Sequence, residues 1–295
     1  MSSGADKSSI REAQFAGRFY PGTKSQLNSV LDNYFDQAES DLPANLPAKP
    51  VQILIVPHAG YPYSGQVAAV GFSQLAPKQQ QRVILLGSSH QKSLSTAAVY
   101  HGKSWQTPLG SAAVNQEAVS TLLNKPGFKA DNLAHQSEHS LEVQIPFLQH
   151  QLGDELSIVP ILVSQLSQQT IEQAAAGLKE IWDEQTVLVI SSDLSHYPQT
   201  DTAEKVDRET IQGIISGEPE YFRQIVRDIQ PMKAVQTRAC GAQAIEIGMR
   251  LAQNWSDTQI ELLKYINSGH KSGNRQRVVG YAAIGFYSRA AQSEA

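Results

Sequence analysis

Three histidines in this sequence follow short apolar runs that are rich in β-branched residues. The runs VQILIVPH, RVILLGSSH and TVLVISSDLSH end at His58, His90 and His196. Runs of this length and composition are typical of buried β-strands. In open α/β sheets the ligand crevice lies just outside the carboxyl ends of the strands. We therefore predict that the three histidines share one site.

Asp193, within the third run, and Cys240, which we place at the start of a helix, extend the set to a metal-binding combination. Imidazole, carboxylate and thiolate are the usual protein ligands for zinc and iron, and a helix N-terminus lowers the pKa of a cysteine. No local metal motif such as HExxH is present, so the prediction depends on the recurrence of the pattern. From the pattern alone, His58 and His90 are equally well explained as strand-end residues that hydrogen-bond the backbone. A lone buried cysteine more often packs as a small apolar side chain.

The neighbouring polar residues each allow two interpretations. His196 would donate and accept protons beside a bound substrate, with Asp193 orienting it or the ligand; alternatively, Asp193 would N-cap the turn after its strand. Glu138 and His139 stand together at an expected helix start. We favour a supporting role in which they orient a ligand histidine over simple stabilisation by the helix dipole. Tyr61 is expected to wall the pocket.

Pairs of serines beside two of the histidines raise the question of a hydrolase. However, no G-x-S-x-G elbow is present, and a serine nucleophile needs a base that a third group orients. We therefore expect Ser192 and the other serines to hydrogen-bond loop backbone or to bind a small anion at the pocket. A zinc or serine hydrolase would instead show ester or amide turnover that Ser192→Ala abolishes.

Composition places the chain among soluble globular proteins. The 295 residues are 41% hydrophobic and 18% charged, enough to bury a substantial core, and the net charge of -4 gives no electrostatic footprint for nucleic acid or an anionic membrane. A single cysteine excludes an intrachain disulfide and favours a reducing compartment. The first residues carry no apolar signal-peptide core, and no apolar run approaches the length of a membrane span. A cytoplasmic protein is expected.

Strand and helix patterns alternate along the chain, which predicts an α/β sandwich. No linker or low-complexity break is visible, so we expect one domain over residues 11–288, between flexible tails at 1–10 and 289–295. The expected strands are 51–58, 82–90, 96–100, 156–163, 187–190, 260–266 and 278–286, and residues 105–110 are expected to form a turn-bounded excursion. The expected helices are 25–38, 65–75 with Ser64 as N-cap, 115–123, one beginning at 137, 169–182, 201–215, 219–227 and 239–251.

Six short motifs resemble those of the Memo family, whose prokaryotic members are called AmmeMemoRadiSam system protein B. The motifs are FYP at 19–21, PHAGY at 57–61, GSSH at 87–90, EHSLE at 138–142, SSDLSH at 191–196 and ACG at 239–241. They follow the family's order and spacing, and the resemblance extends from about Arg11 to Tyr287. The family shares its fold with the LigB-like class III extradiol dioxygenases, which use non-haem iron(II) to open catechol rings.

The resemblance implies a single-domain αβα sandwich of the LigB type, with a mixed central sheet and a metal pocket at the strand ends. His58, His90 and Cys240 fall on the family's metal-ligand positions, and Asp193 and His196 fall on its pocket-lining positions. Iron(II) is the expected cofactor, with copper or zinc as alternatives. The expected function is that of a metal-dependent oxidoreductase of dioxygenase type.

One departure separates this sequence from the extradiol enzymes, which present two histidines and a carboxylate to iron(II). The third position here is Cys240, whose thiolate is softer, tolerates copper(I) or zinc and is itself oxidisable. The departure argues against ring cleavage unless Asp193 supplies the carboxylate.

The rival function is a non-catalytic module that uses the inherited pocket to hold a peptide or a partner protein, although no dense arginine cluster for phosphate is present. The family name also implies association with a radical SAM protein and an AMMECR-type partner. The chain lacks the four cysteines of an iron–sulfur cluster, so radical chemistry would belong to the partner.

Overall fold

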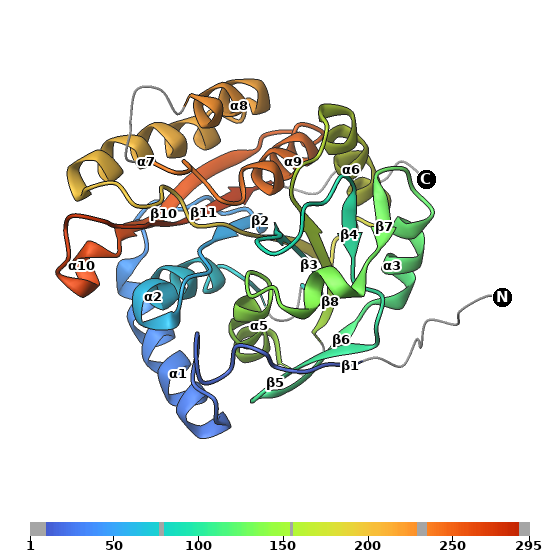
Figure 1. The fold of residues 1–295 in the computed structure, drawn as a ribbon, viewed down its shortest axis with the longest axis horizontal. Helices are drawn as coiled ribbons and strands as arrows, with labels where there is room; N and C mark the ends of the chain where they lie inside the picture. The colour runs from blue at the N-terminus through green and yellow to red at the C-terminus, as the bar shows by residue number, and fades with distance from the viewer. Residues whose placement is uncertain (1–9, 77–79, 154–155, 229–234, 289–295) are drawn as a thin grey trace.

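The computed structural model describes residues 10–76, 80–153, 156–228 and 235–288 (Figure 1). The two expected tails lie almost wholly outside the described residues, and Ile10 already belongs to the first strand. The strands are β1 (Ile10–Arg11), β2 (Val51–Val56), β3 (Arg82–Ser88), β4 (Ala97–Val99), β5 (Ser104–Thr107), β6 (Gly110–Val114), β7 (Phe128–Ala130), β8 (Ser157–Val163), β9 (Thr186–Ser191), β10 (Gln259–Asn267) and β11 (Gly280–Tyr287). The helices are α1 (Lys24–Asp41), α2 (Tyr61–Phe72), α3 (Gln116–Leu123), α4 (Asn132–Gln136), the 3₁₀ turn η1 (Glu142–Gln144), α5 (Ile145–Leu152), α6 (Gln168–Glu180), α7 (Thr200–Ile215), α8 (Pro219–Arg227), α9 (Ala242–Ala252) and α10 (Gly269–Ser272).

The described strands form one mixed sheet in the order β1-β5-β6-β8-β3-β9-β2-β11-β10, and β4 pairs with β8 and β7 beside this path. Strands β8, β3, β9 and β2 run parallel to one another, whereas β11 and β10 continue the sheet in antiparallel pairs. Every residue of β2 and β9 is buried. Complete burial of this kind is typical of parallel strands that are covered on both faces.

Helices cover both faces of the sheet, which confirms the predicted αβα sandwich (Figure 1). Helix α2 packs closely on one face, because a Cβ at Gly71 would lie 2.6 Å from a methyl group of Val56. Helix α9 packs on the other face, where a Cβ at Gly248 would lie 2.4 Å from the side chain of Ile190. Ile190 pairs with Ile55 in the adjacent parallel strand, so these two side chains point to the same face of the sheet. Val56 follows Ile55 in the strand and points to the opposite face. The two helices therefore lie on opposite faces.

Three helix starts differ from the sequence-based prediction. Helix α2 begins at Tyr61 with Gly60 as N-cap, so Ser64 lies inside the helix, where its hydroxyl donates to the carbonyl of Ala59. Pro62 explains the earlier start, because proline is favoured in the first turn of a helix.

A proline in the first turn also marks the start of the helix that was expected to begin at residue 137. Its start is delayed to Ile145, with Pro146 in the first turn of α5 and the turn η1 before it. Helix α9 begins at Ala242, after Cys240 rather than at it. The segment 105–110 is also more regular than predicted, since it forms the β5–β6 hairpin.

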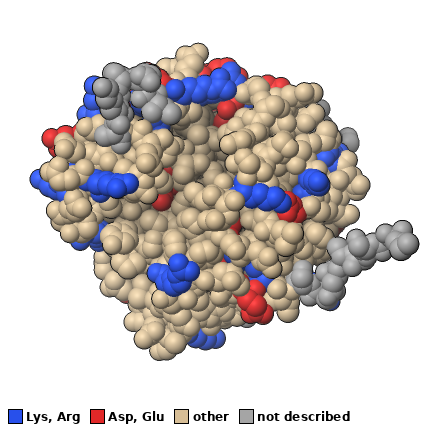
Figure 2. All heavy atoms as spheres, viewed as in Figure 1, with Lys and Arg blue, Asp and Glu red and all other residues tan. Residues whose placement is uncertain are grey.

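Charged side chains of both signs are scattered over the face shown in Figure 2, with large uncharged areas between them. None of the helices in the described ranges is both long enough and apolar enough to span a membrane.

Candidate metal centre

The predicted histidines are brought together because their strands are neighbours. The sheet order β3-β9-β2 places the carboxyl ends of three parallel strands side by side. His58 follows β2 by two residues, His90 follows β3 by two, and the segment from Ser192 to His196 leaves β9 between them. Cys240 reaches the same edge from the turn before α9, where its N–H donates to the carbonyl of Asp193 at 3.2 Å.

One ligand atom from each of His58, His90 and Cys240 lies within 4.8 Å of the other two. Cys240 Sγ and His58 Nε2 are 3.2 Å apart. The imidazole rings of His58 and His90 meet edge to face, with centroids 5.2 Å apart. Three residues separated by up to 182 positions in the chain thus converge on one point, as the sequence analysis predicted.

The tautomer of His58 follows from its hydrogen bonds. Ser191 Oγ donates its only proton to the carbonyl of Ser140 at 2.6 Å. Gln144 Nε2 donates to Ser191 Oγ at 2.9 Å, and it also donates to the carbonyl of Pro57. Ser191 Oγ is therefore an acceptor for His58 Nδ1, at 2.9 Å, so Nδ1 carries the proton. The lone pair of His58 Nε2 is left facing Cys240.

His90 is held by Glu138 through two contacts. The carboxylate accepts the backbone N–H of His90 at 2.6 Å and its ring Nδ1–H at 2.9 Å. Burial would raise the pKa of Glu138, but these bonds, together with the charge of His90 and the N–H of Ser140, lower it to about 2. Burial alone would lower the pKa of His90, yet the hydrogen bond and charge of Glu138 raise it. A carboxylate on Nδ1 leaves Nε2 as the metal-facing nitrogen, a frequent arrangement in metal sites.

Cys240 differs in one respect from the sequence-based expectation. Burial, and secondly the charge of Asp193, raise the pKa of its thiol, whereas a helix N-terminus was expected to lower it. The thiol is not on α9, and among the described residues its Sγ accepts a single backbone N–H, that of Asp193, at 3.2 Å. The thiol is therefore protonated at neutral pH unless a cation binds beside it. The following residue must be glycine, since a Cβ at Gly241 would lie 2.5 Å from Ser192 Cβ.

Asp193 is buried and hydrogen-bonds the backbone of the β2 loop rather than capping a turn of its own. Its Oδ1 accepts the N–H of His58 at 2.8 Å, while Oδ2 lies 4.0 Å from His58 Nε2. Burial raises the pKa of Asp193 to about 7, against the opposing backbone hydrogen bonds and the charge of His90. Among the described residues, Asp193 belongs to neither of the two groups that could hold a metal ion.

We call the group of His58, His90 and Cys240, with the histidines around it, the histidine cluster. His196 lies at its edge, and its Nε2 is buried and without a hydrogen-bond partner in the described part of the chain. Burial, followed by the charge of His90, lowers the pKa of His196 to about 4, so the ring is neutral at pH 7. Its backbone is fixed by hydrogen bonds to Thr237 and Gln236. The next residue, Tyr197, has φ of 72°, an unusual value that surrounding structure must impose.

Another buried carboxylate, that of Asp207 on α7, anchors the same segment through its hydrogen bond to Ser195. Its Oδ1 accepts the N–H of Ser195 and its Oδ2 accepts the hydroxyl proton of Tyr265, both at 2.8 Å. A Cβ at Gly280 would lie 1.9 Å from Asp207 Oδ2, so only glycine fits there. The residue that precedes His196 is thus tied to the helix layer.

His139 joins the cluster more closely than the sequence indicated. Its ring centroid lies 4.9 Å from that of His90 and 5.3 Å from that of His58. With His90 and Glu138 it forms a second group whose ligand atoms could hold a metal ion. Phe19 packs against its other side, with centroids 4.8 Å apart. Burial lowers the pKa of His139 to about 4.

The remaining predicted residues support the site. Tyr61 is buried in the core, where its hydroxyl donates to the carbonyl of Val143 and its ring packs on Phe147. Ser192 Oγ donates to the carbonyl of Asp193 and accepts the N–H of Gly241, a backbone role as predicted. Gln144, which orients Ser191 and thereby His58, was not predicted from the sequence. The signal available in the sequence was a glutamine between two apolar residues, Val143 and Ile145.

Comparison with known proteins agrees with this architecture. A sequence model described as Memo-like protein matches residues 11–285. A MEMO1 family protein of Methanopyrus kandleri is 34% identical over 289 residues, covering 94% of this chain and 98% of its own. One from Aquifex aeolicus is 32% identical, covering 94% and 99%. A solved structure of an uncharacterized protein from Escherichia coli K12 shares the fold, with a TM-score of 0.50 and 14% identity, over 79% of this chain and 99% of that one.

Proposed function

The chain belongs to the Memo family, and from that membership and the geometry of its strand ends we propose that it is a metal-dependent oxidoreductase of dioxygenase type. His58 Nε2, His90 Nε2 and Cys240 Sγ would hold one ion, iron(II) first and copper second. Two imidazoles and one thiolate leave coordination positions open for a substrate.

The observation that carries the proposal is the protonation of the two histidines. Each has its Nδ1 proton engaged by an acceptor, Ser191 Oγ for His58 and the Glu138 carboxylate for His90. Each therefore presents an Nε2 lone pair to a common centre, together with the sulfur of Cys240. If the two histidines only hydrogen-bonded backbone at the strand ends, neither would need an acceptor that keeps its proton on Nδ1. The donor set fits a metal ion that accepts nitrogen and soft sulfur ligands.

A bound iron(II) ion would supply Lewis-acid and redox chemistry at its open positions. The chain's own side chains would handle protons around it. His196 has a neutral ring with a free Nε2 and would accept a proton from a substrate hydroxyl. His139, whose ring packs between Phe19 and His90, would fix the substrate's orientation.

Metal analysis of protein purified without oxygen tests the ligand set. We expect about one iron per chain after anaerobic loading, and loss of stoichiometric iron in His58→Ala, His90→Ala and Cys240→Ser. His150→Ala is the matched control, because His150 pairs with Asp32 on the surface, outside the cluster. Retention of iron by any of the three variants would remove that residue from the ligand set.

Oxygen uptake with catechols then tests the reaction class. Turnover that depends on iron and is reduced in His196→Gln supports the proposal. Stoichiometric iron without oxygen uptake would refute the dioxygenase function and leave a metal-containing binding module as the function of the pocket.

A further inference from the structure

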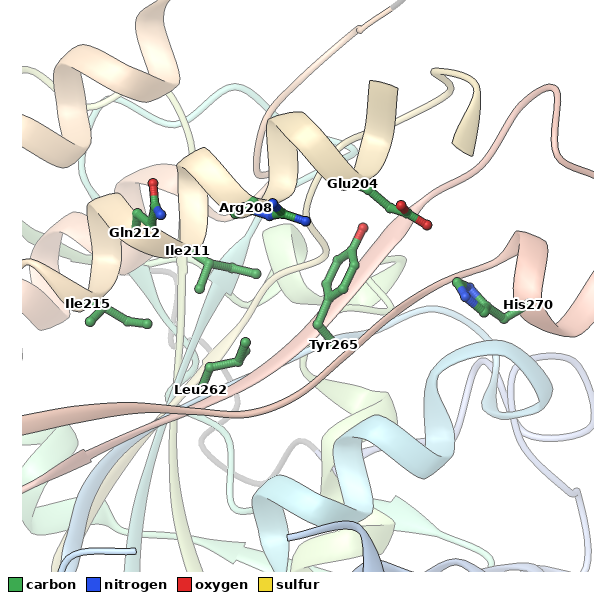
Figure 3. Close-up of a pocket in the computed structure, with 8 residues that line it drawn as sticks. All are labelled: Glu204, Arg208, Ile211, Gln212, Ile215, Leu262, Tyr265 and His270. Atoms are coloured by element: carbon green, nitrogen blue, oxygen red, sulfur yellow. The ribbon is translucent and has the colours of Figure 1, made fainter. Parts of the chain in front are cut away.

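A cavity lies between helix α7 and the edge strand β10, and no residue that lines it belongs to the histidine cluster. Its volume is about 430 Å³ (Figure 3). Cavities of this size hold small organic molecules. The strand β10 pairs only with β11 in the described sheet, so it forms one edge of that sheet.

The α7 wall of the cavity changes character along the helix. Glu204, Arg208, Ile211 and Ile215 are spaced four, three and four residues apart, which places them on one face of the helix. The polar residues lie at one end and the isoleucines at the other. From β10, Leu262 faces the apolar end, as Figure 3 shows.

Tyr265 stands at the polar end, between the tips of Arg208 and Glu204 (Figure 3). Its hydroxyl donates its only proton to the buried Asp207. Toward the cavity, which Tyr265 lines, the phenolic oxygen can therefore act only as an acceptor. The cavity therefore offers an apolar surface at one end and both a cationic and an acceptor group at the other.

The two charged residues at the polar end have no ionic partner in the part of the chain that the structure describes. Glu204 and Arg208 are spaced four apart, a separation at which such side chains can pair with each other. Neither forms an ion pair with any residue in the described ranges, although nine contacts between a lysine or arginine and a carboxylate are found there. Both remain available to a ligand that carries the opposite charges close together.

We propose that this cavity binds a free α-amino acid with a branched aliphatic or aromatic side chain. The ligand carboxylate pairs with Arg208, and the ammonium group lies between Glu204 and the phenolic oxygen of Tyr265. The side chain packs on Ile211, Ile215 and Leu262. A simple amine or a simple carboxylate would satisfy only one of the two charged residues.

Calorimetric titration of the full chain with L-leucine and L-phenylalanine tests the proposal. We expect saturable binding of one molecule per chain. Isoamylamine lacks the carboxylate and 4-methylvalerate lacks the ammonium, so each should bind at least roughly tenfold more weakly, because one charge-assisted hydrogen bond is lost. Absence of saturable binding of both amino acids, or equal affinity for either analogue, would overturn the proposal.

Variants locate the binding site. Arg208→Gln and Glu204→Gln should each weaken leucine binding by roughly tenfold. Ile215→Ser should weaken it less, since Ile215 is already 39% exposed. Arg227→Gln, an exposed arginine on α8, is the matched control and should bind leucine as the unmodified chain does. Equal weakening in the control would place the site elsewhere.

Leucinamide separates a free amino acid from the N-terminus of a peptide. It keeps the ammonium and the side chain but has no carboxylate for Arg208. Weak binding of leucinamide supports the free amino acid. Binding as tight as that of leucine would assign the cavity to peptide N-termini and contradict the proposal.

Discussion

Glu138 and Asp193 are both buried carboxylates beside the same candidate ligands, yet their protonation equilibria are shifted in opposite directions. The pKa of Glu138 falls to about 2, and that of Asp193 rises to about 7. Burial raises the pKa of both groups. Glu138 has in addition the ring N–H of His90, whereas Asp193 has only backbone N–H groups and a more distant His90 charge.

The difference shows that burial does not by itself decide whether a carboxylate is charged. A cationic or ring N–H partner at hydrogen-bond distance outweighs desolvation, and backbone donors alone do not. The Glu138 side of the site is thus suited to fixing His90 in place. The Asp193 side is suited to exchanging a proton near neutral pH.

The variant with the largest expected effect on the free energy of unfolding is Asp193→Asn, measured in metal-free protein. Because the folded state raises the pKa of Asp193 from 3.8, the free energy of unfolding should fall as pH rises from about 4 to about 7, by roughly 4 kcal/mol. Asparagine keeps the acceptor for the N–H of His58 but has no charge to desolvate. Urea unfolding across this range should show a flatter profile for the variant; an unchanged slope would contradict the pKa assigned to Asp193.

Glu138→Gln should act at the opposite end of the pH scale. The folded state lowers the pKa of Glu138 from 4.5, so its stabilisation is present at neutral pH and is lost as pH falls toward about 2, by roughly 3 kcal/mol. The variant should be less stable above pH about 5 and converge with the unmodified protein in acid. Iron affinity should also fall by roughly 10- to 100-fold, because His90 loses its anchor.

Glu39→Gln, on the exposed face of α1, is the control for this variant. It should change neither the acid limb of the stability profile nor iron affinity. Should Glu138→Gln behave like Glu39→Gln in a metal competition assay, the anchoring role of Glu138 would be wrong.

Asp207→Asn extends the comparison to a carboxylate outside the cluster, with the smallest expected effect. Burial raises the pKa of Asp207 to about 6, against hydrogen bonds from Tyr265 and Ser195. Unfolding free energy should therefore decline between pH about 4 and about 6, by roughly 3 kcal/mol at most, and the variant should remove this decline. Iron stoichiometry should be unchanged. Loss of iron in Asp207→Asn would show that the Ser195 anchor controls the ligands directly.

Local patterns were sufficient for the parts of the fold that repeat a simple rule. The apolar runs before His58, His90 and His196 are strands, because strands buried on both faces need continuous β-branched residues. Helix boundaries were less predictable at Ser64 and near residue 137. In both places a proline in the first turn marks the start, and at Ser64 the serine gave a misleading capping signal.

The sequence by itself determined the family, the strands and the chemical types of the candidate ligands, because these depend on residue identity and short-range periodicity. Only the tertiary structure decided which nitrogen of each histidine faces the centre, since that depends on partners such as Ser191 and Glu138 from distant strands and turns. It also decided the opposite pKa shifts of Glu138 and Asp193. Desolvation and hydrogen bonding act through space, and residue order alone does not specify them.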